Sequence, residues 1–236
     1  MTMELYKILE WDTAFFKFPV ARITTEDISE HDVSKIFPLL QKNKVKLVYW
    51  SFNIKKQQLD SIAKNYNGFL TGQKVQFVKN LDQKEKRMIT LSPMIQLRQY
   101  HEKIIHDDLI DLIIQGGIYS RFFTDPKITR QQYENLHRQW ITNSIQENAL
   151  FILEKKKKII GFISLNEKMK RANIDFIVVD DDFRRQGLAN VLMHHAHTWA
   201  FDNNYNQMLG NCSVAILLEE KISRRRISDL GKIIEK

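Results

Sequence analysis

The chain of 236 residues has a single cysteine, Cys212. One thiol cannot form an intramolecular disulfide or supply a cysteine-based zinc cluster. The sequence also lacks any stretch of about 18 uninterrupted apolar residues, the length that a membrane-spanning helix needs. Its first twelve residues carry acidic side chains and no apolar run before a small-residue cleavage site, unlike a secretory signal. These absences predict a protein of the cytoplasm that does not enter a membrane.

Familiar nucleotide-binding and metal-binding patterns are missing as well. Neither the GxxxxGK[ST] loop nor the GxGxxG pattern of dinucleotide-binding folds occurs. Three histidines, His194, His195 and His197, are close in sequence. On a helix the second points away from the other two, and no carboxylate at metal spacing completes a site. We therefore expect packed or solvated histidines and no metal.

The chain does have an ordinary share of apolar residues, 43%, and an excess of basic side chains. This composition is typical of a globular protein with a buried core. A net charge of +8 predicts attraction to polyanions, which include nucleic acids, anionic membranes and phosphate-rich small molecules. The net charge alone does not show which of these polyanions the protein binds. The basic run Lys155 to Lys158 lies between two apolar segments and predicts a solvated hairpin turn, while Arg224 to Arg226 predict a solvated face.

The spacing of apolar residues predicts two domains, residues 1–92 and 93–236. In the first, short strand-like runs alternate with helical segments at about 30–43 and 56–65, which predicts a small α/β domain. Its last strand-like run ends near Val78 and is followed by polar residues. We place the domain boundary at Ser92–Pro93.

In the second domain the pattern predicts helices, then strands, then one more helix. A helix opens near His106–Asp108, and an amphipathic helix carries Tyr133 and Ile141. Three strand-like runs follow, the last at 173–179, and a long helix begins near Leu188. Strands and helices in this order predict an α/β (α+β) fold with a ligand at the carboxyl end of a strand.

The loop between that last strand and the long helix is the most informative segment. A helix amino terminus leaves backbone N–H groups unpaired and carries partial positive charge. Gly187 has no Cβ, so a phosphate can approach the backbone closely. Arg184 and Arg185 add positive charge, and the small Ala189 keeps the next turn accessible. The segment predicts a cradle for a pyrophosphate.

The pattern Arg184-x-x-Gly187-x-Ala189 after a strand ending in Val179 resembles the fingerprint of the GNAT superfamily of N-acetyltransferases. The six residues alone would also fit a basic turn before a surface helix, but the preceding strand and hairpin favour the GNAT interpretation. The resemblance implies a mixed central sheet flanked by helices, here preceded by the smaller α/β domain. It also implies acetyl-CoA as the acyl donor and direct transfer to an amine.

Further segments are similar to TDP-fucosamine acetyltransferases and their relatives. They are Trp11–Phe16, Ala21–Ile23, Ser120–Phe122, Asp125–Pro126, Tyr133, Trp140–Ser144 and Gly161–Glu167. That resemblance implies an acceptor amine on a dTDP-4-amino-4,6-dideoxygalactose. Other amines stay open, such as a protein amino terminus or a small polyamine, as does a non-catalytic remnant that binds coenzyme A. We expect no nucleic acid partner and keep a homodimer as a possibility.

The GNAT resemblance also assigns site residues. The donor site consists of backbone groups of one strand, the loop after it and one asparagine: Ile177, Val178, Val179, Arg184, Arg185, Gln186, Gly187, Leu188, Ala189 and Asn211. Glu167 could accept the proton of the amine, directly or through water, or it is an exposed strand-end carboxylate. Arg121 could bind a phosphate of the nucleotide sugar, or it is a surface arginine.

The carboxyl end, residues 206–236, departs from the family pattern. When Asn211 and Ala215 are set near the family's Asn and Ala, Glu219 stands where a tyrosine serves as general acid to the departing thiolate. A glutamate is ionised at neutral pH unless burial raises its pKa, so it is a poor acid. The altered end predicts a slow enzyme or a displaced tail.

Overall fold

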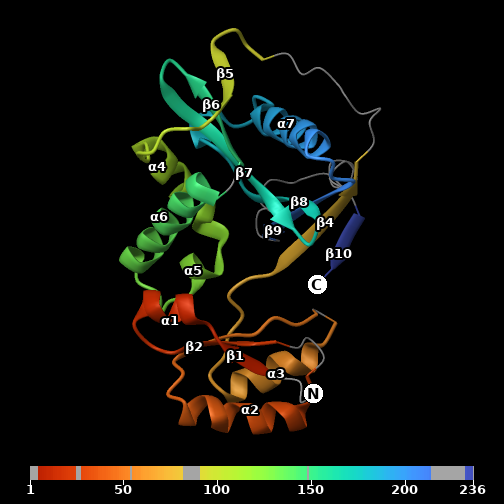
Figure 1. Cartoon of the computed structure of the whole chain (residues 1–236). Coiled ribbons are helices and arrows are strands. Elements are labelled where there is room, and N and C mark those ends of the chain that lie inside the picture. The colour runs from red at the N-terminus through yellow and green to blue at the C-terminus, as the bar shows by residue number, and fades with distance from the viewer. Residues whose placement is uncertain are drawn as a thin grey trace. The chain divides into compact units, whose positions relative to one another are not determined.

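The computed structural model describes residues 5–24, 28–53, 55–81, 91–147, 149–213 and 232–235. By their contacts, the residues form two compact units, Met1–Leu70 with Glu235–Lys236, and Thr71–Ile234. Figure 1 labels their helices and strands. Among the described residues, no helix combines the length and the apolar character needed to cross a membrane.

The first unit is a small three-stranded sheet with helices. The strands β1 (Tyr6–Ile8), β2 (Val20–Ile23) and β3 (Leu47–Tyr49) lie in the order β1-β2-β3, with β1–β2 antiparallel and β2–β3 parallel. The helices are α1 (Glu10–Phe16), α2 (Glu30–Lys42) and α3 (Gln57–Asn65).

A capping box fixes the start of α2, the helix that connects the parallel strands. The Ser29 hydroxyl accepts a hydrogen bond from the Asp32 amide at 3.1 Å, and the Asp32 carboxylate accepts one from the Ser29 amide at 3.2 Å. Val33, Ile36 and Leu40 recur at helical spacing and are buried against β2 residues. The local pattern therefore determines both where this helix begins and which face it buries.

The second unit is built on a seven-stranded mixed sheet. Its order is β10-β4-β9-β8-β7-β6-β5. The strands are β4 (Lys74–Asn80), β5 (Ile95–Gln99), β6 (Ala149–Lys155), β7 (Lys158–Lys168), β8 (Arg171–Val179), β9 (Gln207–Ser213) and β10 (Lys232–Glu235). Neighbours from β5 to β8 are antiparallel, whereas β8 and β9 are parallel.

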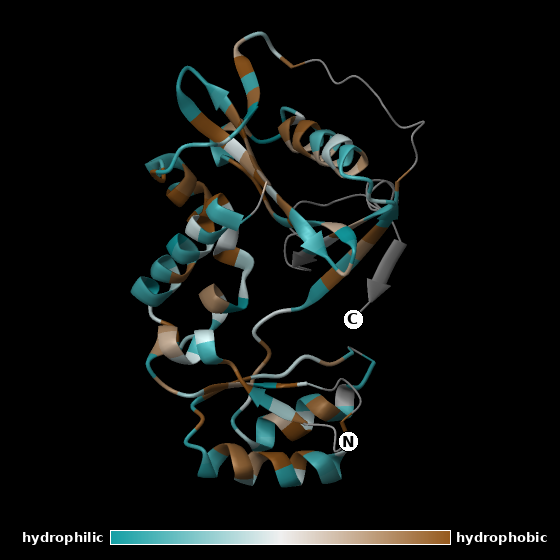
Figure 2. Ribbon diagram, viewed as in Figure 1, coloured by the Kyte–Doolittle hydropathy of each residue, from teal (hydrophilic) through white to brown (hydrophobic). Residues whose placement is uncertain are grey.

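Helices cover both faces of this sheet (Figure 1). One face packs against α7 (Leu188–Asp202), and its core includes Leu165, Leu192 and Ala196. The other packs against α4 (Asp107–Gly116) and α6 (Arg130–Glu147), with the short η2 (Gly117–Tyr119) and α5 (Arg121–Thr124) between them. Apolar residues are concentrated in the central strands, which are covered on both sides (Figure 2). The predicted α/β class, with a mixed sheet flanked by helices and a smaller amino-terminal unit, is confirmed.

The boundary between the units differs from the predicted Ser92–Pro93. The division falls after Leu70, because β4 belongs to the second sheet. It pairs with β9 over seven residues, from Lys74↔Ser213 to Asn80↔Gln207. The partners are more than 100 residues apart in sequence, so local patterns did not reveal the pairing.

The contact between α4 and α6 depends on a glycine. A Cβ at Gly117 would overlap His137 Nε2 and lie 2.6 Å from the Tyr133 hydroxyl. Both rings are 1% exposed, and the Tyr133 hydroxyl donates a hydrogen bond to the Ile114 carbonyl at 2.5 Å. Burial lowers the pKa of His137, so the imidazole is neutral at pH 7. Neither ring can move aside cheaply.

We therefore expect Gly117→Ala to destabilise the protein by about 1–3 kcal/mol, as overpacking does. Thermal denaturation should show a drop in Tm of about 2–10 °C. The matched control is Gly72→Ala, because a Cβ at Gly72 would have no neighbour within 4 Å. Equal Tm values for the two variants would contradict the packing assigned to Gly117.

Candidate functional site

The loop after β8 ends in a backbone conformation with a positive φ angle, which favours glycine. The Asp180 amide donates to the Ile160 carbonyl at 3.0 Å, and η3 (Asp181–Phe183) follows. The chain then passes through Arg185 with φ 61° and Gly187 with φ 78°, and α7 begins at Leu188. A positive φ is costly for arginine and costs glycine nothing. The loop is therefore a specific local structure and not an extended linker.

The start of α7 is open to an anion. Gly187 is the N-cap residue and has no side chain to cap the first amides of the helix. A Cβ at Gly187 would meet no atom within 4 Å, so there is free space directly beside the loop. Unpaired amides, a helix amino terminus and free space together fit a phosphate group.

The charges around the loop are largely paired. Lys158 Nζ lies 2.8 Å from Asp180 Oδ2, and Arg184 forms an ion pair with Asp181. The hydrogen bond with Asp180 raises the pKa of Lys158, so this lysine stays protonated. Arg185 is exposed and has no ion-pair partner among the described residues. Arg185 is thus available for a ligand, while Arg184 holds the loop in place.

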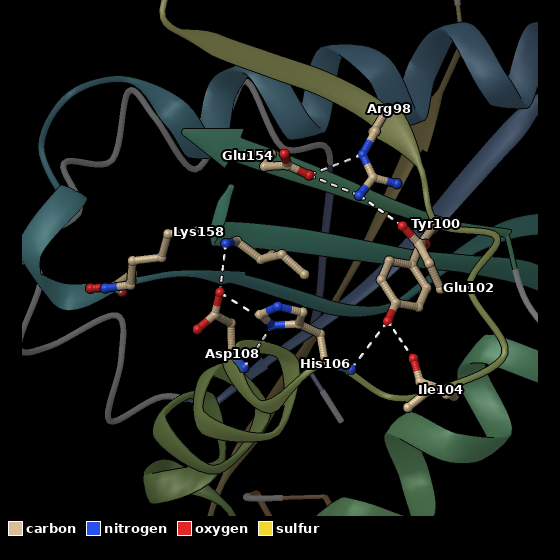
Figure 3. A network of polar contacts seen from close by, with 10 residues as sticks. Arg98, Tyr100, Glu102, Ile104, His106, Asp108, Glu154 and Lys158 are labelled. Carbon is tan, nitrogen blue, oxygen red and sulfur yellow. Dashed lines mark hydrogen bonds and ion pairs between the residues drawn. The ribbon is translucent and has the colours of Figure 1, made fainter. Parts of the chain in front are cut away.

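A polar network fixes the same end of the sheet (Figure 3). Asp108 Oδ2, at the start of α4, accepts a hydrogen bond from the Ile159 amide at 2.8 Å. His106 Nδ1 accepts one from the Asp108 amide at 3.3 Å, and the Tyr100 hydroxyl accepts one from the His106 amide at 3.1 Å. Ile159, which binds Asp108, is followed by Ile160, whose carbonyl accepts the hydrogen bond of the Asp180 amide. The network therefore helps to position Asp180, the first residue of the loop.

Strand β8 separates from β9 near its start. The two strands pair at Ala172↔Met208 and Asn173↔Leu209, and in the part of the chain that the structure describes no later pair follows. On the β7 side, Ser164↔Phe176 and Leu165↔Ile174 leave Asp175 as an inserted residue, a β-bulge. A bulge bends its strand. Beyond it, the backbone groups of β8 that point toward β9 have no partner on that strand.

Aromatic side chains line the β8 face that meets α4 and α6. Phe176 and Val178 pack there, with the Trp140 ring 5.9 Å from that of Phe176. A Cβ at Gly116 would lie 2.6 Å from Val178 Cγ2, so the end of α4 comes very close to the strand. Trp140 in turn contacts Phe122 at 5.2 Å between ring centroids.

The predicted donor residues lie around the gap between β8 and β9. The backbone of Ile177 to Val179 lies beyond the bulge, and the Arg184–Ala189 loop follows directly. Asn211 is exposed on β9, three residues past Met208, which places it at the level of Asp175 across the gap. The structure thus brings strand, loop and asparagine to one opening.

The proposed acceptor and catalytic residues are more scattered. Arg121 begins α5, and its guanidinium lies 4.5 Å from the centroid of the Phe122 ring, which links it to the aromatic face. Glu167 pairs with Ala172 and lies seven residues from Val179 along β8, about 23 Å at the usual rise. Its Oε2 accepts a hydrogen bond from the Tyr205 hydroxyl at 2.9 Å. Glu219 lies outside the described residues.

Two features were missed in the sequence. Asn173 is 5% exposed, its Nδ2 donates to Asn166 Oδ1 at 2.8 Å, and its own Oδ1 is buried without a hydrogen-bond partner in the described part of the chain. It stands where the β8–β9 pairing ends. The only sign of this buried amide in the sequence was one polar residue, Asn173, beside an apolar run. Lys155 and Lys158 lie over the Phe183 ring, at 5.1 and 5.5 Å, so the basic hairpin adjoins the loop.

The clustered histidines pack against the fold. The His195 ring stacks edge-on against Phe151 at 4.3 Å, and burial lowers its pKa. Among the described residues, no group of three or more potential ligands is arranged to hold a metal ion.

The family model described as "Acetyltransferase (GNAT) family" matches residues 117–215. The match covers less than half of the chain. Over these residues the chain is similar to the acetyltransferases of this family. No match is found among curated proteins.

Solved structures share the fold at low sequence identity. A protein of unknown function from Staphylococcus epidermidis aligns with a TM-score of 0.60 and 12% identity, over 97% of this chain and 85% of that one. A GCN5-related N-acetyltransferase from Sphaerobacter thermophilus aligns with a TM-score of 0.53 and 10% identity, over 88% and 67%. Another from Kribbella flavida gives 0.51 and 8%, over 83% and 72%. These three alignments extend beyond residues 117–215, and they show similarity of fold alone.

We expect Gly187→Val to weaken acetyl-CoA binding at least tenfold, about 1.4 kcal/mol, in calorimetry. The side chain would occupy the free space beside the amides, and valine is also strained at φ 78°. Gly187→Asn separates the two effects, because asparagine tolerates this backbone region yet still fills the space. Unchanged affinity in both variants would refute the cradle.

Proposed function

We propose that the protein transfers the acetyl group of acetyl-CoA directly to the amine of a nucleotide amino sugar, of the dTDP-4-amino-4,6-dideoxygalactose type, in the cytoplasm. The observation that carries the donor half is the uncapped glycine loop directly beside the separation of β8 from β9. The acceptor half is supported by the similarity of the sequence segments described above.

The donor site is made mainly of backbone groups. The amides of Gln186 to Ala189 suit the pyrophosphate, and Arg185 adds a cation without an ion-pair partner in the described residues. The backbone groups of Ile177 to Val179 that point away from β7 suit the amide-rich pantetheine arm, and an N–H there can polarise the thioester carbonyl. The Val179 carbonyl is already engaged, because it accepts a hydrogen bond from Arg184 Nε at 3.4 Å. Acetyl-CoA supplies the activated acyl group, and the protein holds it in position.

Transfer requires a neutral amine, whose nitrogen bonds to the thioester carbon while the carbon–sulfur bond breaks. The amine's proton needs an acceptor, and we assign this to Glu167. Since its partner Ala172 lies about 16 Å from Ile177 along β8, the proton must pass along a chain of water molecules. Burial, then the hydrogen bond to Glu167, raises the pKa of Tyr205, so this phenol stays protonated and orients the carboxylate. The proton that the departing sulfur takes up is assigned to Glu219, which leaves this step inefficient.

The acceptor is assigned to the aromatic face of β8. Arg121, held over Phe122, offers a cation to a sugar-nucleotide phosphate, and the rings of Trp140 and Phe176 offer stacking surfaces. The net charge of +8 favours a doubly phosphorylated acceptor together with a phosphorylated donor.

A transfer assay tests the acceptor. Release of coenzyme A from acetyl-CoA should be measured with a dTDP-4-amino-dideoxy sugar, a peptide with a free amino terminus and a polyamine. We expect the nucleotide sugar to be preferred, and Arg121→Gln to raise its KM about tenfold without changing the KM for acetyl-CoA. Preference for the peptide or the polyamine would overturn the sugar assignment. Acetyl-CoA binding without turnover on any of them would indicate an impaired enzyme.

The role of Glu167 gives a separate prediction. Glu167→Gln should lower kcat by about 10²–10⁴ while acetyl-CoA affinity stays within twofold. The activity that remains should rise with pH, since the amine must then lose its proton to solvent. Glu134→Gln is the matched control, because Glu134 is a partly exposed ion-pair partner of Arg130 on α6. If the two variants were equally active, Glu167 would be only a strand-end carboxylate.

A further inference from the structure

A pocket of about 390 Å³ lies beside the start of α7. The loop and the first turn of α7 form one wall, and the segment that enters β5 forms the other. Its lining residues are Leu91, Ser92, Ile95, Gln186, Gly187, Leu188, Asn190 and Val191. Half of them are aliphatic, and the others offer amide, hydroxyl or backbone groups. This mixture and this volume fit a small ligand with a flat apolar part.

The basic hairpin adjoins this pocket. Ile95 in the pocket wall is the antiparallel partner of Lys155, the last residue of β6. Antiparallel partners lie about 4.5–5.5 Å apart, so the turn that follows Lys155 is at the pocket edge. Lys155 and Lys158 are engaged with Phe183, and Lys158 also with Asp180.

The two lysines at the tip of the hairpin are the available charges. Lys156 and Lys157 are exposed, and the described residues give them no ion-pair partner. Their φ angles are 50° and 70°, a turn conformation for which Asn-Gly is the preferred sequence. Two exposed lysines without an ion-pair partner in the described residues therefore lie next to the pocket. Asparagine and glycine would form this turn more easily than two lysines do.

We infer that this pocket receives the adenosine part of coenzyme A and that Lys156 and Lys157 bind its 3′-phosphate. The inference rests on the proposed donor site, because the pyrophosphate on the Gln186–Ala189 amides places the attached nucleoside next to the loop. The aliphatic wall covers the adenine, and Asn190 and Ser92 are within the same pocket to meet its polar edge. A phosphate monoester carries about −1.5 to −2 charges at neutral pH, which two lysines balance.

The fold contains a matched control for the hairpin. The turn from β7 to β8 also has positive φ angles, 54° at Met169 and 59° at Lys170, and it also carries lysines, Lys168 and Lys170. It is at the other end of the eleven-residue β7, about 33 Å away. Removal of two charges there changes the net charge equally but leaves the pocket unchanged.

Calorimetry with coenzyme A and with 3′-dephospho-coenzyme A tests the lysines. We expect the wild-type protein to prefer coenzyme A about three- to tenfold, and the double variant Lys156→Gln/Lys157→Gln to lose this preference. Lys168→Gln/Lys170→Gln should keep it, and about 1 M salt should abolish it in the wild type. A preference that survives in the hairpin variant would overturn the inference.

A pocket-filling variant, Ser92→Trp, tests the adenosine. It should weaken binding of coenzyme A and of dephospho-coenzyme A at least fivefold and leave 4′-phosphopantetheine binding unchanged, because that fragment lacks the nucleoside. Unchanged affinity for coenzyme A would place the adenosine elsewhere. If the wild type bound none of the three compounds, the donor site itself would fail, whereas equal binding of coenzyme A and dephospho-coenzyme A would refute the phosphate contact alone.

Discussion

The site depends on how β8 is paired. Along β7 it is hydrogen-bonded for almost its whole length, but the inserted Asp175 bends it, and its parallel pairing with β9 ends at Asn173. A central strand normally has both sets of backbone groups paired, since unpaired buried groups are costly. Here the backbone groups of β8 that face β9 have no partner on that strand after Asn173, and we propose that the amides of the pantetheine arm pair with them. The loop, the start of α7 and the facing Asn211 all take their positions from this one separation.

Rigid surroundings keep this opening in place. On one side, α7 packs through Leu188, Leu192 and Ala196 onto the sheet. On the other, Gly116 brings the end of α4 against Val178, and the Asp108 carboxylate fastens the start of the same helix to β7. Both ends of α4 are therefore attached to the sheet. A preformed site of this kind binds without a large cost in ordering.

Local patterns predicted the elements well and their pairing poorly. The expected helices at 30–43 and from Leu188 correspond to α2 and α7, because caps and apolar spacing are properties of neighbouring residues. The loop before α7 was expected because its glycine and arginines are close in sequence, while its role as a phosphate cradle stays a prediction. The place of β4 beside β9, the bulge at Asp175 and the buried amide of Asn173 depend on residues distant in sequence. The same holds for the hairpin lysines, whose proximity to Phe183 only the fold shows.

Binding and chemistry depend on different kinds of groups in this protein. The proposed donor site consists mostly of backbone amides, whose positions follow from sheet pairing and from φ at Arg185 and Gly187. Side-chain replacement elsewhere hardly changes them. In the proposed reaction, proton transfer instead depends on single side chains, Glu167 with Tyr205 and the glutamate in the divergent carboxyl end, and a neighbour cannot replace a proton acceptor or donor. Under the proposed assignment, a change in the carboxyl end therefore acts on turnover before it acts on coenzyme A affinity.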